Sequence, residues 1–297
     1  MASAGREFFQ ERYEQLGGEV ASVQITQSIR VNTLKTTCKE LISRLSSKGV
    51  VLEREPLAKN AYRVVSSPFS LGAITEYLLG LYALQEVAAQ IPVEVLAPRQ
   101  GELVLDCCAA PGGKSSQIAQ LMKNKGRLVC YELKPHRLKS LLVNLERMGV
   151  KNAVVFRADV SRVRLLNKEF DKVLVDAPCS GNYVLEKGWF EKRRLEGILR
   201  NAQIQRKILS SAVSVARQGG VIVYSTCSLE PEENELVIDW AIRNLPVKVV
   251  LANVKGASPG VVDVFGARLH SDVSKCARLW PHKTKTQGFF IAKLVKK

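Results

Sequence analysis

Strand-forming and helix-forming segments alternate regularly from Gly101 to the end of the chain, and this pattern constrains the fold more than any other feature. The strand candidates are short runs of Val, Ile, Leu and Phe, and apolar residues recur at helical spacing between them. Strands are expected over residues 102–108, 126–133, 152–159, 170–178, 219–226, 246–251 and 288–295, and helices over residues 114–122, 134–149 and 198–218. The alternation predicts an α/β fold with a doubly wound, mostly parallel sheet that is covered by helices on both faces.

The part of the chain before this alternation has a different pattern. Its expected elements are strands over residues 28–34, 50–56 and 61–65, a helix over residues 38–49, and a helical segment over residues 75–96 that joins the two parts. A short helix among several strands predicts a small α+β module packed against the larger unit. We therefore divide the chain into an N-terminal module with the joining helix at residues 1–95 and an α/β domain at residues 96–297.

Charge is the most informative property of the composition. The formal net charge is +16, which favours polyanionic partners, and nucleic acid is therefore the expected partner. A content of 46% hydrophobic and 24% charged residues predicts a globular protein with a hydrophobic core. No apolar run approaches the roughly 20 residues that a membrane span needs. The N-terminus is polar and lacks an apolar signal core, so we expect a cytoplasmic protein without a membrane partner.

The cysteines do not follow a metal-binding or disulfide pattern. They are Cys38, Cys107, Cys108, Cys130, Cys179, Cys227 and Cys276. Their number is odd, their spacing includes no Cys-x-x-Cys, and the chain has only three histidines. We therefore expect neither a metal site nor a disulfide framework, and we expect most of these thiols to be small buried side chains.

Ligands of doubly wound sheets bind beyond the carboxyl ends of the strands. The first strand ends in a turn of small residues, Ala109 to Gly113, which leads into a helix that begins near Lys114. Such a turn lets the backbone approach a polar ligand closely, although a plain turn is the alternative. Glu132 ends the second strand, where an acid binds ribose hydroxyls or caps the next helix. Asp159 ends the third strand, where it can accept from an adenine amino group or from the backbone.

Two thiols and an acid follow the next two strands. The fourth strand ends in Asp176, with Cys179 shortly after it, and the fifth ends at Cys227. In a doubly wound sheet these strands are neighbours beside the first, so the three side chains are expected to converge near the cofactor. Residues 231–233 look like the first turn of a helix. A single cysteine at a strand end is usually a packing residue, but two beside an acid and a nucleoside site indicate an active site.

The sequence contains the motifs "RVNTLK" at residues 30–35, "DCCAAPGGKSSQIA", "DAPCSG", "YSTCSLEPEENE" and the tail "RLWPHKTKTQGFFIAKL". Together and in this order they resemble the Nop/Sun family of RNA cytosine-5 methyltransferases, over nearly the whole chain. Within that family the sequence is most similar to the compact archaeal tRNA enzymes. The resemblance implies a class I, Rossmann-like domain that uses S-adenosylmethionine, preceded by a small RNA-binding module.

The resemblance also implies a role for each motif residue. The methionine and adenosine groove would be lined by Cys108, Ala109, Ala110, Pro111, Gly112, Gly113 and Lys114. Glu132 would hold the ribose and Asp159 the adenine edge, while Asp176 would lie between the cofactor and the target base. Cys227 would be the nucleophile, and Cys179 would assist release of the product.

The chemistry of cytosine supports these roles. Carbon 5 is too weak a nucleophile to take a methyl group directly, but a thiolate that adds to carbon 6 makes carbon 5 reactive. A free thiol with a pKa of about 8.5 is mostly protonated at neutral pH. Basic surroundings and the helix start at Pro231 are expected to lower the pKa of Cys227. A protonated Asp176 could hydrogen-bond nitrogen 3 of the base.

RNA contacts are expected from two segments. Lys192, Arg193 and Arg194 lie in a basic run that follows the fourth strand, and Arg30, Asn32 and Lys35 belong to the "RVNTLK" motif. The neighbouring Trp189 and Phe190 either stack on bases or belong to the core.

Several alternatives remain open at this point. The expected substrate is tRNA, with ribosomal RNA as the second choice. A DNA cytosine methyltransferase would use Cys179 as its nucleophile. A non-catalytic RNA-binding assembly factor would have the same fold without the methyltransferase activity. A redox role for Cys179 and Cys227 is the weakest alternative, because it leaves the nucleoside-type residues unexplained. A monomer is expected, and an accessory protein is compatible with the sequence.

Overall fold

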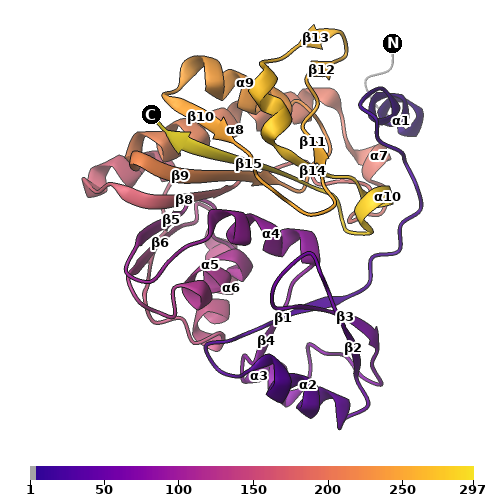
Figure 1. The fold of residues 1–297 in the computed structure, drawn as a ribbon, viewed down its shortest axis with the longest axis vertical. Helices are drawn as coiled ribbons and strands as arrows, with labels where there is room; N and C mark the ends of the chain where they lie inside the picture. The colour runs from indigo at the N-terminus through magenta and orange to yellow at the C-terminus, as the bar shows by residue number, and fades with distance from the viewer. Residues whose placement is uncertain (1–4) are drawn as a thin grey trace.

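Two main sheets form the body of the molecule in the computed structural model, which describes residues 5–297 (Figure 1). In these residues the larger sheet has nine strands in the order β11–β14–β15–β9–β8–β5–β6–β7, and β10 pairs with β15 outside this path. Its strands are β5 (Leu103–Asp106), β6 (Arg127–Tyr131), β7 (Ala153–Phe156), β8 (Phe170–Asp176), β9 (Ala216–Thr226), β10 (Val247–Val250), β11 (Ser258–Pro259), β14 (Ala277–Leu279) and β15 (Phe289–Lys296). Every strand that the alternation predicted is present.

The centre of this sheet is parallel and one edge is antiparallel. Strands β5 to β9 pair in parallel, whereas β15 runs antiparallel to β9 and carries β10 and β14, both antiparallel to it. The expectation of a mostly parallel α/β sheet is therefore confirmed for the central strands. Their carboxyl ends lie at one edge of the sheet, which is where the polar motif residues are found.

Helices cover both faces because successive strand residues point to opposite sides. On one face Val104, Leu174 and Val223 pack in a cluster with helices α4 (Val87–Leu96), α5 (Gly113–Leu121) and α6 (Pro135–Arg147). On the other face, the neighbouring residues Leu105 and Val173 pack with α8 (Leu195–Val215), α9 (Glu235–Asn244) and the 3-10 helix η1 (Val160–Leu166). The remaining short elements are β12 (Asp263–Val264), β13 (Ala267–Arg268), η2 (Ser271–Lys275), α7 (Trp189–Lys192) and α10 (Pro281–Thr284).

The N-terminal module is a separate antiparallel sheet of order β2–β3–β1–β4. Its elements are β1 (Ser28–Val31), α2 (Cys38–Ser46), β2 (Val51–Arg54), β3 (Ala61–Ser66), α3 (Thr75–Leu78) and β4 (Tyr82–Leu84). Ile29 and Val31 of β1 pack against Leu41 and Leu45 of α2 in a small core of their own. This arrangement matches the predicted α+β module.

The expectation of one helical segment over residues 75–96 is wrong. The segment forms α3, then β4 alongside β1, and then α4. Gly80 breaks the helix: its φ is +72°, and an added Cβ would lie 1.9 Å from the carbonyl oxygen of Arg147. Helix α4 packs on β8, β9 and β15, so by its contacts it belongs to the larger unit.

Helix α1 (Arg6–Gln15) also belongs to the larger unit, although the sequence division placed it in the N-terminal module. Its buried Phe9 meets Trp189 of α7 at a ring distance of 4.8 Å, and Tyr13 meets Trp280 at 6.2 Å. Figure 1 shows α1 beside α7, far from the small sheet. Aromatic packing at long sequence separation decides this placement. Among the described residues, no helix is long and apolar enough to cross a membrane.

Candidate active site

The two predicted active-site thiols lie in contact at the carboxyl edge of the large sheet. Cys227 follows β9 and Cys179 lies in the loop after β8, and their sulfur atoms are 3.3 Å apart. Strands β8 and β9 are parallel neighbours with Asp176 opposite Ser225, so both strands deliver their next residues to the same place. Both cysteines are half-buried, and neither is part of a disulfide.

The hydrogen bond between the thiols gives them opposite acidities. Either sulfur can donate in this geometry, and with Cys179 as the donor the bond lowers the pKa of Cys227 below its ordinary value, against the opposing effect of burial. The same bond, together with burial, raises the pKa of Cys179 well above its ordinary value. Cys227 is therefore the thiol that ionises, and Cys179 keeps its proton and remains a donor.

The predicted helix start near Cys227 is wrong, and so is its part in acidifying the thiol. Residues 231–234 form a turn, and α9 begins only at Glu235. The positive charge of Lys114 does contribute to the lowered pKa of Cys227, after the larger effect of the Cys179 hydrogen bond. The donor thiol thus replaces the helix terminus that the sequence suggested.

Asp176 lies at the end of β8 beside the thiols. One of its carboxylate oxygens accepts from Lys114 Nζ at 2.7 Å, and the other accepts from Ser225 Oγ at 2.9 Å. The Lys114 bond connects the glycine turn after β5 to the acid after β8, and Lys114 Nζ also lies over the Phe289 ring. Three neighbouring strands therefore contribute to one polar cluster, as the sequence predicted.

A cavity of about 550 Å³ opens beside this cluster, at the tips of β5, β6 and β7. Its walls are formed by Cys107, Cys108, Tyr131, Glu132, Leu133, Lys134, Arg137, Ala158, Asp159, Val160, Ser161, Pro178, Asn201, Ile204, Lys207, Ile208 and Ser211. Of the predicted cofactor residues, Cys108, Glu132 and Asp159 line this cavity, whereas Ala109 to Lys114 and Asp176 are not among its lining residues. Mixed apolar walls with two carboxylates in this volume suit a nucleoside-sized ligand.

Both carboxylates in this cavity also accept from the backbone, and Asp159 is the N-cap of η1, whereas Glu132 bonds the residue before α6 and does not cap that helix. Glu132 Oε1 accepts from the Lys134 backbone N–H at 2.8 Å, and Asp159 Oδ1 accepts from the Ser161 N–H at 2.8 Å. The second oxygen of Glu132 faces Arg137 at 3.6 Å, and each carboxylate oxygen has two lone pairs, so these contacts are compatible with the predicted ligand roles.

The glycine turn after β5 is built over a buried acid that sequence reasoning missed. Asp106 accepts from Ser115 Oγ at 2.7 Å and from the Cys108 N–H at 3.3 Å, and burial raises its pKa to about 6. Gly112 adopts a φ of +102°, and a Cβ there would lie 3.2 Å from Leu141 Cδ1. The available signal was an acid at the last position of the first strand, directly before the two cysteines.

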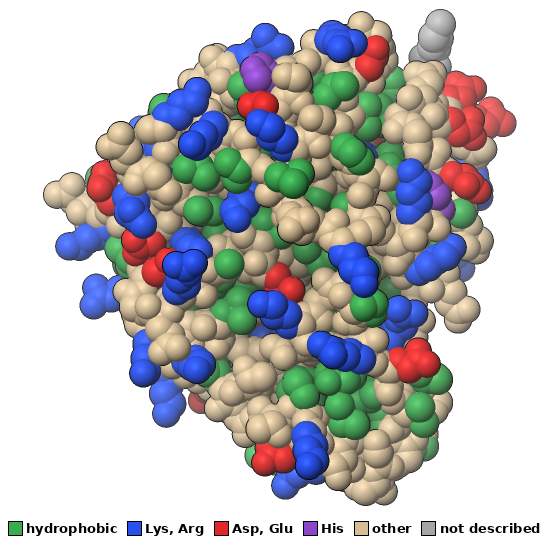
Figure 2. Space-filling view, viewed as in Figure 1, with side chains coloured by type: hydrophobic (Ala, Val, Ile, Leu, Met, Phe, Trp, Pro, Cys, Tyr) green, Lys and Arg blue, Asp and Glu red, His purple; other side chains and the backbone are tan. Residues whose placement is uncertain are grey.

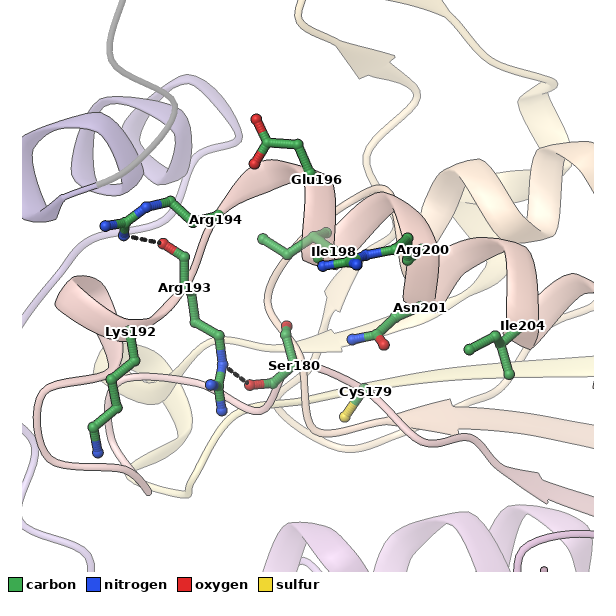
Figure 3. Close-up of a pocket in the computed structure, with 11 residues that line it drawn as sticks. Cys179, Ser180, Lys192, Arg193, Arg194, Glu196, Ile198, Arg200, Asn201 and Ile204 are labelled. Carbon is green, nitrogen blue, oxygen red and sulfur yellow. Dashed lines mark hydrogen bonds between the residues drawn. The ribbon is translucent and has the colours of Figure 1, made fainter.

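A second cavity, of about 690 Å³, lies on the other side of Cys179 (Figure 3). Its lining residues are Cys179, Ser180, Lys192, Arg193, Arg194, Glu196, Gly197, Ile198, Arg200, Asn201 and Ile204. It shares Asn201 and Ile204 with the first cavity, so the two meet along α8. The predicted RNA-contacting residues Lys192 to Arg194 therefore lie beside an active-site thiol, together with Arg200 from the same segment of the chain.

Two of the predicted RNA contacts in the N-terminal module need correction. Arg30 and Asn32 are buried, at 1% and 0% exposure. Arg30 donates to Gln120, to Ser116 Oγ and to the Gly113 carbonyl, and Asn32 donates to the carbonyls of Gly80 and Met148. These side chains fasten the module to α5 and α6 and are not available to RNA.

The contacts of Lys35, and of the two aromatic residues in the basic run, bear on the roles predicted for them. Lys35 is exposed, but its ammonium donates to the carbonyls of Leu79 and Arg147. Trp189 and Phe190 are buried against Phe9, so the core interpretation is correct for both rings.

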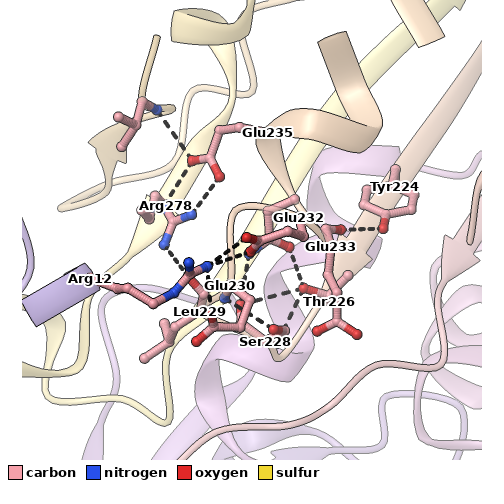
Figure 4. A network of polar contacts seen from close by, with 12 residues as sticks. Arg12, Tyr224, Thr226, Ser228, Leu229, Glu230, Glu232, Glu233, Glu235 and Arg278 are labelled. Atoms are coloured by element: carbon pink, nitrogen blue, oxygen red, sulfur yellow. Dashed lines mark hydrogen bonds and ion pairs between the residues drawn. The ribbon is translucent and has the colours of Figure 1, made fainter. Parts of the chain in front are cut away.

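The acidic loop after Cys227 is a buried polar network that the sequence did not reveal (Figure 4). Glu230 and Glu232 accept from Arg12 of α1, and Glu235 pairs with Arg278. Glu233 accepts instead from Ser180, the residue after Cys179. Four acids within six positions are typical of a solvent-exposed segment. Only their pairing with residues distant in the sequence shows that they are buried and bonded. Within the described residues there is no cluster of side chains that could hold a metal ion.

Comparison with known proteins agrees with this geometry. The family model described as 16S rRNA methyltransferase RsmB/F matches residues 93–295. A human relative named 28S rRNA (cytosine(4447)-C(5))-methyltransferase is 39% identical over 91% of this chain, which spans only 34% of that protein. The tRNA (cytosine(49)-C(5))-methyltransferase of Pyrococcus abyssi is 35% identical over 91% of this chain and 88% of its own length. The solved structure of NSun6 from Pyrococcus horikoshii with SFG has a TM-score of 0.82 at 26% identity, and covers 98% of this chain and 94% of its own.

Proposed function

The chain belongs to the 16S rRNA methyltransferase RsmB/F family, and on this premise we propose that it methylates carbon 5 of a cytosine in RNA. The observation that carries this proposal is the pair of thiols 3.3 Å apart, one acidified and one kept protonated, beside a nucleoside-sized cavity. The fold is the class I, Rossmann-like methyltransferase fold. A DNA enzyme that attacks through Cys179 is disfavoured, because the raised pKa of Cys179 keeps that thiol protonated.

Cys227 carries the first step in this proposal. Its thiolate adds to carbon 6 of the cytosine, and the new C–S bond makes carbon 5 electron-rich. The thiolate is favoured because the pKa of Cys227 is lowered by the hydrogen bond from Cys179. The base must leave its stack to reach this site, since the thiols lie at a sheet edge between two cavities.

Asp176 positions the base and balances charge in this scheme. Its carboxylate is held by Lys114 and Ser225, so its orientation is fixed before substrate binds. Lys114 supplies the proton that a ring nitrogen needs as charge builds on the base, and Asp176 holds the ammonium in place. The sequence-based idea that Asp176 itself carries the proton remains a second form of the same proposal.

Cys179 acts in product release. The carbon 5 proton passes to a water molecule, the electron pair of the broken C–H bond restores the double bond to carbon 6, the C–S bond breaks, and the ring nitrogen returns its proton to Lys114. The sulfur of Cys227 departs as a thiolate. A hydrogen bond from the Cys179 thiol to that sulfur stabilises the leaving group, as a donor stabilises any developing anion in a partly dry site.

The first cavity is the proposed site of S-adenosylmethionine, which supplies a methyl group carried on a sulfonium when it is bound. Glu132 would hold the ribose hydroxyls and Asp159 the adenine edge, and Cys108 would line the groove. The turn from Ala109 to Lys114 would border the methionine end. A family relative whose solved structure carries SFG, an analogue of this cofactor, supports the assignment.

RNA is proposed to enter through the second cavity. Lys192, Arg193, Arg194 and Arg200 surround it, and Lys and Arg side chains are spread over both units on the face shown in Figure 2. Transfer RNA is the first choice, because the match to the archaeal tRNA enzyme runs through 88% of that protein. Ribosomal RNA is the alternative, favoured by the 39% identity to the human 28S rRNA enzyme. We propose a monomer, because one chain contains both thiols, Asp176 and both cavities.

Bisulfite sequencing of cellular RNA with and without the gene tests this function. We expect loss of 5-methylcytosine at a single tRNA position, restored by the wild-type gene and not by C227A. Loss confined to ribosomal RNA would select the alternative substrate. Unchanged RNA together with no binding of S-adenosylmethionine in calorimetry would select a non-catalytic assembly factor.

A further inference from the structure

The carboxylate of Glu233 ties together the two loops that carry the active-site thiols. Its oxygens accept from the Ser180 backbone N–H at 3.0 and 3.2 Å and from Ser180 Oγ at 2.6 Å. Ser180 directly follows Cys179, and Glu233 lies in the turn that follows Cys227. The carboxylate is fully buried, and hydrogen bonds to a buried charged group are the strong ones.

Further bonds hold the residues on both sides of Cys179. Gln205 Nε2 donates to Glu233 at 3.3 Å and to the Pro178 carbonyl at 2.9 Å. Ser180 Oγ lies 3.1 Å from Ser228 Oγ. Residues 178 and 180 are thus anchored through one carboxylate and its neighbours, and Cys179 lies between them with its sulfur 3.3 Å from that of Cys227.

The other acids of the loop point elsewhere. Glu230 and Glu232 turn toward Arg12, at 3.1 and 2.6 Å, and Glu235 turns toward Arg278 (Figure 4). Among these four acids of the described chain, Glu233 makes the contact with Ser180. A neighbouring acid of similar burial therefore serves as a control for simple loss of a buried carboxylate.

We propose that Glu233 is a positioning residue for product release, which holds the Cys179 thiol against the sulfur of Cys227. This rests on the proposed function, in which Cys227 leaves carbon 6 as a thiolate that Cys179 stabilises. Without the Glu233 carboxylate, the loop at Ser180 loses its anchor and the donor thiol no longer stays in place. The C–S bond then breaks slowly, and the enzyme accumulates as a covalent adduct with RNA.

The test measures the covalent RNA adduct by denaturing gel electrophoresis after incubation with S-adenosylmethionine. The probes are a pool of transcribed tRNAs and a pool of transcribed rRNA fragments. The variants are E233A, E233Q, C179A and E232A, each checked for thermal unfolding and cofactor binding. We expect E233A to accumulate about tenfold more adduct than wild type, as C179A does, because a bond to a charged group is lost. E233Q keeps an acceptor for the Ser180 N–H and should release normally.

The controls separate the two proposals. E232A loses the Arg12 ion pair from the same turn and should be destabilised without accumulating adduct. Adduct in C179A but not in E233A would overturn the role of Glu233, and so would equal accumulation in E232A. Absence of adduct from every variant, C179A included, would instead overturn the proposed function.

Discussion

At the scale of single residues, the hydrogen bond between the thiols decides which sulfur attacks. The motifs alone placed both cysteines at one sheet edge, and the assignment of nucleophile and helper came from a family resemblance. The geometry adds a physical cause, because the donor lowers the pKa of Cys227 and raises that of Cys179. Sequence patterns do not encode which thiol donates, since this depends on loop positions set by Glu233 and Ser180.

The pH dependence of adduct formation tests this cause. The thiolate is the reactive form, so formation rises with pH through the pKa of Cys227. C179A removes the donor and raises that pKa, and its profile should therefore shift to higher pH. C179S keeps a hydroxyl donor and should shift less. Single-turnover rates between pH 6 and 9 provide the measurement, and profiles that coincide for C179A and wild type would contradict the donor role.

At the scale of elements, the periodic helices and strands of the catalytic unit were predictable because each carries its own pattern. Residues 75–96 were not, because β4 exists only through pairing with β1 and because Gly80 must approach the Arg147 carbonyl. The sequence pattern did not predict the position of α1 either. The carboxylate that accepts from its Arg12 and Tyr13 lies in the loop after Cys227, more than 200 positions away.

Loss of Arg12 should destabilise the protein in a pH-dependent way. Burial raises the pKa of Glu230 to about 7, so the folded state holds that proton more tightly than the unfolded state. The cost of burying this carboxyl therefore grows as pH rises from its ordinary pKa to about 7, and Arg12 limits the cost because its charge lowers the pKa of Glu230; without Arg12 that pKa is higher still and the cost keeps growing above pH 7. R12A should therefore lose about 3 kcal/mol of unfolding free energy at pH 8 and less at pH 6.

Urea unfolding at both pH values measures this difference. R243A is the matched control, because its ion pair with Asp239 is exposed at the Arg243 side chain and should contribute under about 1 kcal/mol. An R12A penalty that is the same at pH 6 and pH 8 would refute the linkage to Glu230.

At the scale of the whole molecule, the net charge of +16 predicted a polyanionic partner but not where it binds. The location proposed here rests on three-dimensional packing, which removes Arg30 and Asn32 from the surface and gathers Lys192 to Arg194 with Arg200 around the cavity beside Cys179. The buried Arg30 joins the N-terminal module to α5 through the Gly113 carbonyl and the Ser116 hydroxyl.

Salt dependence of RNA binding tests the location. Each phosphate contact contributes a slope of about −0.7 to a plot of log affinity against log salt for single-stranded RNA. R200A should weaken tRNA binding and reduce the magnitude of the slope by about that amount. Arg217 lies beside Asp171 at the opposite edge of the sheet, where β8 and β9 begin. R217A should therefore leave the affinity for tRNA and the salt slope unchanged. Equal effects of R200A and R217A would show that only the overall charge matters.

The central claim is that Cys227 forms the covalent bond to cytosine, and peptide mapping of the trapped complex tests it most directly. C179A is incubated with S-adenosylmethionine and transcribed tRNA, digested with nuclease and protease, and analysed by mass spectrometry. The account predicts a nucleotide attached to the peptide that contains Cys227, and no adduct in C227A. A nucleotide attached to Cys179 in C227A would contradict it.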